Sequence, residues 1–369
     1  MDKSQPVRIL HFPDSLHRSN GRMSIVMNVF RQLDRQKIQF DFAVPRSVKS
    51  DYEEEIVALG GRVHYYSGSL RNYRQVKKFI RDLLSKYAYQ VIHYHATSIW
   101  GASLPAGVTK GVKHRIIHSH NSVFSQTRLK SFRNRLFSHF TRQYATEYVA
   151  CSKLAGETLF GTAKFRVLTN AIDTNKYKYD AMARQRIRSQ YHFDQTTVVL
   201  GHIGRLTTTK NQSFSLKLLQ RLIQSGINAK LVLLGEGPDE AALRQLVAEN
   251  NLLQSVVFAG LRTDVHAFYS ALDMLLMPSL YEGLPMVGVE AQTSGLPVIF
   301  SDHVTTEAGL INASFLPLSD LNSWLKQIDW LKSQNINRAQ AQAMVKNAGF
   351  DVVNGTHQWQ QMYEQMINR

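Results

Sequence analysis

The chain has 369 residues, 44% of them hydrophobic, and a formal net charge of +16 at pH 7. This length suits two domains with separate cores, and the absence of repeats or low-complexity tracts excludes a fibrous or disordered protein. No apolar run approaches the roughly 18 residues of a membrane span and no apolar leader opens the chain, so we expect a cytoplasmic protein. The single Cys151 cannot form an internal disulfide, which agrees with a reducing compartment.

The positive charge is concentrated in the first half of the chain. Residues 1–175 hold 27 Lys and Arg against 12 Asp and Glu, whereas residues 176–369 hold 17 against 16. A partner attracted by positive charge therefore meets the first half. The candidates are nucleic acid, an anionic membrane surface and a phosphorylated substrate.

Short apolar runs recur along the chain with helical stretches between them. They cover residues 7–12, 40–44, 62–66, 90–96, 115–121, 148–152, 165–170, 198–204, 230–237, 256–261, 274–279 and 297–302. Most are continuous rather than alternating, as in strands buried on both faces of a parallel sheet. The predicted fold class is α/β, with two Rossmann-like, doubly wound domains, a hinge near 173–180 and a ligand cleft between the domains.

The predicted domains are residues 1–175, which would bind an acceptor, and residues 176–350, which would bind a nucleotide. Residues 351–369 are expected to form a C-terminal helix that could pack back on the first domain.

Polar residues gather at the strand ends of the predicted second sheet, where open α/β sheets bind their ligands. The string GRLTTTKN (204–211) follows one strand, and in it Gly204 allows close backbone approach. Its two cations, Arg205 and Lys210, suit a diphosphate, because a guanidinium can fork onto two oxygens and an ammonium acts as a point charge. The alternative is that both cations only face water.

A second polar cluster surrounds a short predicted helix. Pro285 and Gly295 mark its start and end, with Glu282 just before the start and Glu290 about two turns in. Backbone amides at the start of the helix would bind phosphate, and the carboxylates would accept hydrogen bonds from hydroxyls of the same ligand. The ligand would thus be both a phosphate and a polyol. The alternative is that both acids lie on an ordinary helix surface.

Five ordered strings resemble one family. They are VLTNAID, GRLTTTKN, LLGEGP, FAGLRTDV and PSLYEGLPMVGVEAQTSGLPVIFSD. Together they resemble the retaining nucleotide-sugar glycosyltransferases of family four, which have the GT-B fold, and in particular the bacterial branch that builds exopolysaccharide or capsule. Glu282 and Glu290 match the Glu-x7-Glu element of that family.

The resemblance implies a role for each matching residue. Arg205 and Lys210 would hold the donor diphosphate and stabilise the departing nucleotide, Glu282 would bind the donor sugar, Glu290 the ribose, and His120 would lie near the reacting sugar. The remaining donor-binding positions would be Gly21, Gly204, Gly235, Arg262, Gly283, Leu284, Met286 and Val287. The loop at Gly21 departs from the Gly-Gly-x-Glu of the family, because Asn20 replaces the first Gly and Met23 the Glu. Asn tolerates a left-handed backbone, so the turn could survive, but an acidic acceptor contact there is in doubt.

The resemblance also implies the reaction. A hexosyl or N-acetylhexosaminyl group would move from a nucleotide sugar, with UDP as the expected nucleotide, to a saccharide acceptor that is lipid-linked, by front-face attack with retention. The chain contains no Asp-x-Asp, so we expect a metal-independent enzyme without cofactor, in which cations and a helix start replace the metal.

Residues 128–144 combine five cations with Phe132, Leu136 and Phe140 at the spacing of one helix face. Such a helix could rest on an anionic surface at the inner face of the cell membrane and present the acceptor. The alternative is a helix that packs its apolar stripe on the sheet.

Three other functions remain open. His93, His95, His118 and His120 form two His-x-His pairs that could serve a metal-dependent hydrolase. A nucleotide-sugar epimerase or a phosphorylase would use the same fold. Nucleic-acid binding is not expected, because the aromatic residues are not interleaved with the basic ones.

Overall fold

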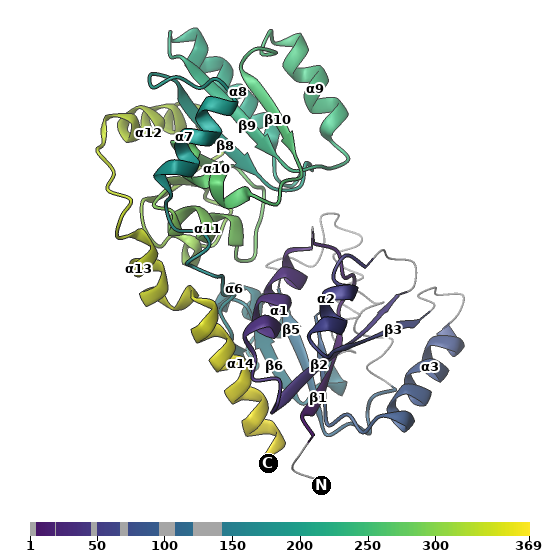
Figure 1. Cartoon of the computed structure of the whole chain (residues 1–369). Helices are drawn as coiled ribbons and strands as arrows, with labels where there is room; N and C mark the ends of the chain where they lie inside the picture. Colours follow the sequence, from purple (N-terminus) through teal and green to yellow (C-terminus); the bar gives the residue numbers. More distant parts are fainter. Residues whose placement is uncertain (1–4, 19, 46–49, 67–72, 96–107, 121–141) are drawn as a thin grey trace. The chain divides into compact units, whose positions relative to one another are not determined.

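A computed structural model describes residues 5–18, 20–45, 50–66, 73–95, 108–120 and 142–369. The chain forms two compact units, which we call the N-terminal unit (Met1–Ile172 with Val352–Arg369) and the C-terminal unit (Asp173–Asp351) (Figure 1). Each has a parallel sheet flanked by helices, which confirms the predicted doubly wound α/β class. No helix in the described ranges is long and apolar enough to cross a bilayer.

The sheet of the N-terminal unit is parallel, in the order β3-β2-β1-β4-β5-β6-β7. Its strands are β1 (Val7–Phe12), β2 (Ile38–Pro45), β3 (Arg62–Tyr66), β4 (Val91–Tyr94), β5 (His114–Ser119), β6 (Glu147–Ala150) and β7 (Arg166–Val167). Its helices are α1 (Gly21–Gln32), α2 (Glu53–Ala58), α3 (Tyr73–Lys86), α6 (Lys153–Phe160) and α14 (Val352–Ile367). The strand expected at 165–170 shrinks to the two exposed residues of β7, because an edge strand has a neighbour on one side only.

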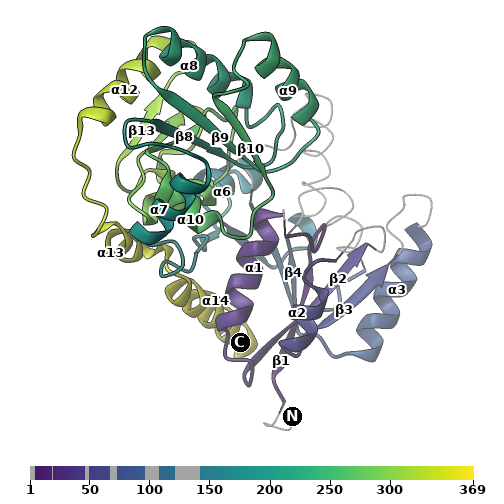
Figure 2. The ribbon, with the colours of Figure 1, turned by 45° about the horizontal axis from the view of Figure 1, so that its top comes forward.

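Helix α14 brings the end of the chain back to the N-terminal unit. It lies beside α1 in both views (Figures 1 and 2). Trp359, Met362, Tyr363 and Met366 recur at helical spacing and are buried in the same core as Phe40 of β2. The helix is therefore part of this unit's core.

The sheet of the C-terminal unit is parallel, in the order β10-β9-β8-β11-β12-β13. Its strands are β8 (Val198–Ile203), β9 (Ala229–Leu234), β10 (Val256–Gly260), β11 (Met274–Met277), β12 (Val298–Ser301) and β13 (Ala313–Leu316). Its helices are α7 (Ala181–Gln190), α8 (Gln212–Gln224), α9 (Glu240–Glu249), α10 (Val265–Ala271), α11 (Met286–Thr293), η3 (Thr306–Ala308), α12 (Leu321–Ser333), α13 (Ala341–Val345) and η4 (Lys346–Phe350). Strand β13 was not among the predicted runs, because its four half-buried residues lie at the sheet edge.

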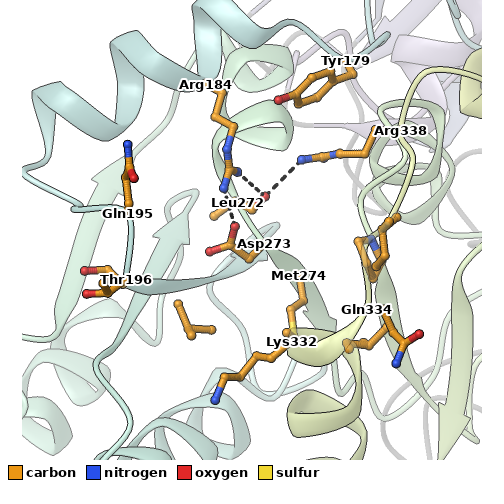
Figure 3. Close-up of a pocket in the computed structure, with 15 residues that line it drawn as sticks. Tyr179, Arg184, Gln195, Thr196, Leu272, Asp273, Met274, Lys332, Gln334 and Arg338 are labelled. Atoms are coloured by element: carbon orange, nitrogen blue, oxygen red, sulfur yellow. Dashed lines mark hydrogen bonds and ion pairs between the residues drawn. The ribbon is translucent and has the colours of Figure 1, made fainter.

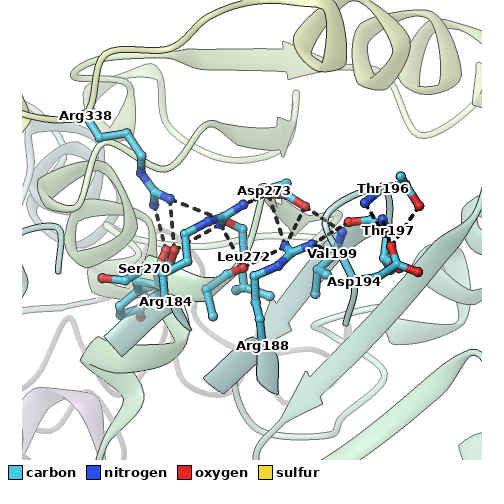
Figure 4. A network of polar contacts seen from close by, with 12 residues as sticks. Arg184, Arg188, Asp194, Thr196, Thr197, Val199, Ser270, Leu272, Asp273 and Arg338 are labelled. Atoms are coloured by element: carbon cyan, nitrogen blue, oxygen red, sulfur yellow. Dashed lines mark hydrogen bonds and ion pairs between the residues drawn. The ribbon is translucent and has the colours of Figure 1, made fainter. Parts of the chain in front are cut away.

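Charged side chains hold α7 against the amino ends of the strands (Figure 4). Asp273, just before β11, pairs with Arg184 at 2.7 Å and with Arg188 at 3.2 Å, and it accepts a hydrogen bond from the amide of Val199 at 2.8 Å. Arg338 donates to the carbonyl oxygens of residues 269, 270, 272 and 294. These ions are held by several partners each, as partly buried charges require.

Candidate functional site

The carboxyl ends of β8, β9 and β10 are joined by their backbones. Gly204 donates its amide to the carbonyl of Leu234 at 2.8 Å, and Gly235 donates to the carbonyl of Gly260 at 2.9 Å. Gly235 has φ +134°, and a Cβ there would lie 2.1 Å from the carbonyl oxygen of Gly204. Only glycine adopts this φ readily and also leaves out the Cβ for which there is no room. The loops therefore form a close-packed edge that is lined by backbone.

Lys210 and Glu282, predicted to bind the same ligand, meet in the structure. The ammonium of Lys210 forms an ion pair with Oε1 of Glu282, and the Ser279 hydroxyl donates to the same oxygen at 2.9 Å. The two side chains are 20% and 16% exposed. The amide of Leu280 donates to the carbonyl of Thr209 at 2.8 Å, which holds the two loops side by side. The pair is thus fixed by its loops yet open to a ligand.

Helix α11 begins next to this pair. Pro285 is its N-cap residue and offers no side-chain acceptor, so the amides of Met286 and Val287 in the first turn lack partners within the helix. In the part of the chain that the structure describes, the amides of Gly283 and Leu284 donate no backbone hydrogen bond. Four amide donors, two before Pro285 and two after it, together with the positive end of the helix, favour an anion at this point.

Glu290 lies on α11 beside two tyrosines. Its Oε2 accepts a hydrogen bond from the hydroxyl of Tyr269 at 2.7 Å. Burial raises the pKa of Glu290, while hydrogen bonds from Tyr269 and Tyr177 and the charge of Lys176 oppose that shift. The carboxylate is held by phenol donors and remains half-buried, which suits an acceptor for a further hydroxyl.

The two predicted arginines differ in their surroundings. Arg205 is exposed, and none of the described residues makes a hydrogen bond or an ion pair with its guanidinium. Arg262 forms a two-point pair with Asp264, at 2.8 and 3.0 Å. The guanidinium of Arg205 is therefore available to an anion. The guanidinium of Arg262 is already neutralised by Asp264, so only the backbone of Arg262 remains to contact a ligand.

The loop at Gly21 is a helix N-cap and not a left-handed turn. Asn20 has φ −87° and ψ 101°, and its side chain accepts a hydrogen bond from the amide of Arg22 at 3.1 Å. The expectation that Asn20 preserves the glycine turn through a left-handed backbone is therefore wrong, because an N-cap residue is extended. A Cβ at Gly21 would meet nothing within 4 Å, and Met23 is 1% exposed in the core.

His120 directly follows β5 and belongs to a group of buried imidazoles. Nε2 of His120 is 3.0 Å from Nδ1 of His95, and Nε2 of His95 is 2.8 Å from Nδ1 of His11. A second chain joins Nε2 of His93 to Nδ1 of His118 at 3.1 Å and Nδ1 of His93 to the Tyr363 hydroxyl at 2.6 Å. Burial lowers the pKa of His11 and His118 to about 3 and that of the other three histidines well below its usual value.

Two triads of these imidazoles, His11/His93/His95 and His95/His118/His120, have nitrogens close enough to be considered for a metal ion. Two nitrogens on one tetrahedral zinc would be about 3.3 Å apart at the usual Zn–N distance. The observed 2.8–3.1 Å separations are those of hydrogen bonds. The geometry therefore favours imidazoles that are hydrogen-bonded to one another, and not the metal site that the hydrolase alternative requires.

A cavity of about 470 Å³ lies at the opposite end of the C-terminal sheet (Figure 3). Its lining includes Thr196 before β8, Asp273 before β11 and Pro297 before β12, so it opens at amino ends of strands. Its two arginines, Arg184 and Arg338, already bind carbonyl oxygens or Asp273. This cavity is separate from the candidate site. Most of the basic segment 128–144, up to residue 141, lies outside the described residues.

Several residues of the site were not predicted. His11 of β1 lies opposite His93 of β4 in the register of the sheet, and a histidine within a predicted strand was the available signal. Tyr269, Ser279 and Tyr363 gave no signal, because their positions next to Glu290, Glu282 and His93 arise from contacts distant in sequence.

Comparison with known proteins identifies the class. Residues 183–348 match the family described as "Glycosyl transferases group 1", and residues 21–176 match "Glycosyltransferase Family 4". The chain is 34% identical over 348 residues to "Putative glycosyltransferase EpsF" of Bacillus subtilis, covering 89% of this chain and 88% of the relative. It is 23% identical to the "UDP-Gal:alpha-D-GlcNAc-diphosphoundecaprenol alpha-1,3-galactosyltransferase" of Escherichia coli, over 74% of this chain and 73% of the relative.

Among solved structures, Anabaena Alr3699/HepE in complex with UDP and glucose superposes with a TM-score of 0.81 at 18% identity, covering 97% of this chain and 100% of that one. The chain therefore belongs to the group 1 glycosyltransferases of family four. It is a glycosyltransferase, and its two doubly wound units are those of the GT-B fold.

Proposed function

We propose that the protein is a retaining transferase that moves a hexosyl or N-acetylhexosaminyl group from a UDP-sugar to a saccharide acceptor. The observation that carries the proposal is the Lys210–Glu282 pair beside the unpaired amides before α11, because it puts a cation, an acid and a helix start within one ligand's reach. HepE, which shares the fold, was solved with UDP and glucose. The preference for UDP rests on that likeness.

In this reaction the diphosphate leaves with its negative charge growing. Arg205, Lys210 and the N-terminus of α11 would stabilise that charge, which is the usual source of catalysis in phosphate leaving-group chemistry. Glu282 would accept hydrogen bonds from the sugar hydroxyls and Glu290 from the ribose. The acceptor hydroxyl would attack from the side of the departing phosphate and give its proton to a phosphate oxygen, which retains the anomeric configuration.

The acceptor that we propose is a lipid-linked saccharide used in exopolysaccharide or capsule synthesis. The name of the Escherichia coli relative specifies a diphosphoundecaprenol acceptor, and the basic first half of the chain would be attracted to an anionic membrane. The proposed location is cytoplasmic and peripheral at the inner face of the membrane.

Metal independence is also part of the proposal. Arg205 and Lys210 would supply the positive charge that a divalent ion supplies elsewhere, and the chain has no Asp-x-Asp clamp. Transfer rates in EDTA equal to those in Mg²⁺ or Mn²⁺ would agree with this expectation, and a strict need for either ion would contradict it.

The testing experiment is thermal stabilisation by UDP, GDP and their sugars, for the wild type and Glu290→Ala. A ligand that binds only the folded state raises the melting temperature by mass action. We expect UDP and one UDP-sugar to raise the melting temperature of the wild type but not of Glu290→Ala. Glu249→Ala, at the exposed end of α9, serves as the control.

Absence of any nucleotide effect in the wild type would overturn the donor-site assignment. Incubation of the stabilising sugar with undecaprenyl-diphosphate saccharides, followed by NMR of the product anomer, then tests acceptor and retention separately. An inverted product would refute the retaining mechanism while leaving the donor site intact.

A further inference from the structure

A groove lies at the edge of the sheet in the C-terminal unit, away from the candidate site. It has a volume of about 750 Å³ and is bounded by the start of β13, one side of α12 and residues 334–337 after that helix. All strands of the sheet are parallel, and the groove borders the amino end of β13. It therefore lies at the opposite end of the sheet from Lys210 and Glu282, which follow the carboxyl ends of β8 and β11.

The lining of this groove is polar but carries no charge in the part of the chain that the structure describes, although charged residues make up 20% of the sequence. The neighbouring cavity of Figure 3 shares part of its wall and contains arginines, a lysine and an aspartate. The lack of charge is thus a property of the groove and not of this surface. Five carboxamides line it, those of Asn312, Gln327, Gln334, Asn335 and Asn337. We call it the amide groove.

Helix α12 has two different faces, and one of them lines the amide groove. Trp324 and Leu331 are seven residues apart and are buried in the core of the unit. Gln327 and Trp330 are three residues apart on the adjacent face, and Gln334 follows one turn later at the end of the helix. The helix therefore fixes the spacing of the indole and two carboxamides along one wall.

The two tryptophans of α12 differ in their surroundings. Trp324 is 0% exposed and donates its indole N–H to the carbonyl of Pro317 at 3.0 Å. Trp330 is 55% exposed, and its indole N–H has no hydrogen-bond partner within the described ranges. Trp330 thus gives the groove a flat aromatic surface with a free donor at its edge.

Two of the carboxamides are oriented by local hydrogen bonds that leave one group of each free. The nitrogen of Gln334 donates to the carbonyl of Trp330 at 3.3 Å and to the Ser333 hydroxyl at 3.0 Å, so its oxygen remains an acceptor. The oxygen of Asn337 accepts from the amide of Ala339 at 3.0 Å, so its nitrogen remains a donor. The other three carboxamides make no side-chain hydrogen bond to a described residue. The groove therefore offers donors and acceptors together.

These groups match the chemistry of a neutral saccharide. Each sugar hydroxyl donates and accepts, as a carboxamide does, and a pyranose ring has a face of C–H groups that can lie on an indole. The volume is within the roughly 300–1,000 Å³ of small-ligand sites. An anion is disfavoured, because no described cation lines the groove and the last turn of α12, its negative end, forms part of the wall.

The alternative occupant is an extended protein segment that adds to β13, because β13 is an edge strand. Two features argue against it. Strand β13 has only four residues, and Asn312 directly before it has φ +47°, which interrupts the extended backbone. Strand addition also needs pockets for alternate side chains, whereas this groove has carboxamides around one aromatic ring. A saccharide is therefore favoured.

We propose that the amide groove is a saccharide-binding site separate from the site of transfer. It holds a neutral oligosaccharide, with Trp330 against one sugar ring and the carboxamides bonded to hydroxyls. The inference goes beyond the proposed function, since it depends on neither the nucleotide, the donor sugar nor retention. A glycosyltransferase with such a second site would keep a long saccharide at a high local concentration.

The first test follows the indole N–H signal of Trp330 in proton–nitrogen spectra, assigned by its loss in Trp330→Ala. The neutral probes are maltohexaose, cellohexaose, galactohexaose and chitohexaose, and hexagalacturonate is the anionic control. We expect at least one neutral probe to shift the signal in a saturable manner and hexagalacturonate to leave it unchanged. No shift by any neutral probe up to about 10 mM, which would detect a Kd of about 1 mM, would overturn the proposal.

The second test compares three variants of α12 by calorimetric titration with the probe that binds. Trp330→Ala should weaken binding roughly tenfold or more, because truncation of a tryptophan at the centre of a contact has that order of effect. Gln327→Ala should weaken it several-fold through a lost hydrogen bond. Asn322→Ala removes an exposed carboxamide from the first turn of the same helix, outside the groove, and should bind as the wild type does.

The outcomes separate this inference from the proposed function. Unchanged binding in Trp330→Ala would place the saccharide elsewhere and overturn the proposal. A wild-type dimer that Trp330→Ala converts to a monomer in sedimentation would also overturn it, because a second copy would then occupy the groove. The rise in melting temperature with UDP should persist in Trp330→Ala. Saccharide binding without any response to UDP would count against the proposed function only, and the reverse result against the amide groove only.

Discussion

The two units share one doubly wound plan but differ in what occupies the carboxyl ends of their central strands. In the N-terminal unit these ends carry five buried imidazoles that mostly bond to one another. In the C-terminal unit they carry close-packed glycines, the Lys210–Glu282 pair and a helix start with unpaired amides. The imidazoles of the first set find most of their hydrogen-bond partners among themselves, whereas the groups of the second set are open to an anionic ligand. The same architecture therefore supports two kinds of polar site.

Acidification should produce the largest difference in stability between the two units. In the folded state the pKa values of the five histidines are depressed, so above about pH 6.5 they are neutral whether the chain is folded or not. Below that pH the unfolded chain binds protons that the folded chain does not bind, so stability falls as the pH moves towards the lowered folded pKa values, which are about 3 for His11 and His118. Each histidine contributes about 1.4 kcal/mol per pH unit, so the N-terminal unit should lose several kcal/mol by pH 5.5.

In the described part of the C-terminal unit only His202 has a comparably lowered pKa, to about 3. Calorimetry from pH 7.5 to 5.5, with proteolysis and mass spectrometry to assign each transition, should show the N-terminal unit melting first. Equal destabilisation of both units would contradict this difference.

Removing Lys210 should have the largest effect on catalysis. Lys210→Ala takes away the cation that pairs with Glu282 and would face the departing diphosphate. We expect kcat/KM to fall by about 10²–10³, as for loss of one group that stabilises developing charge. Lys217→Ala, on the exposed face of α8, should retain activity. A similar loss in both variants would indicate a general charge effect.

Gly235→Ala should test the close packing of the strand ends. The new Cβ would lie 2.1 Å from the carbonyl oxygen of Gly204 at φ +134°, so the loops must separate. We expect roughly 2–4 kcal/mol of lost stability in the C-terminal unit, measured by urea unfolding. The matched variant Gly226→Ala has φ +78° and open space around its Cβ, so it should cost only about 1 kcal/mol.

Glu282→Gln should have the smallest effect of these variants, and it should change UDP binding and the rate of transfer in opposite directions. Without its carboxylate partner, Lys210 is released for a diphosphate, and we expect UDP to bind several-fold more tightly by calorimetric titration. Transfer should slow, because the amide is a weaker acceptor for the sugar hydroxyls. Weaker UDP binding would mean that the carboxylate serves mainly to position Lys210.

Sequence reasoning identified groups that lie on short, continuous stretches. Gly204 and Lys210 follow one strand, and Glu282 follows another, so parallel topology predicted that they would lie at the same sheet edge. It failed where a contact depends on long-range packing. Tyr269 meets Glu290 from a different helix, and Tyr363 reaches His93 from 270 residues away.

The sequence by itself determined the α/β class, the parallel strands and the family, because continuous apolar runs and ordered strings at strand ends are local features. The tertiary structure decided which nitrogens of which histidines meet, that Asn20 caps a helix, and that Lys210 and Glu282 form a pair. Those outcomes depend on register between strands and on side-chain burial. Both are set by the packing of the whole unit and leave no mark on any single stretch of chain.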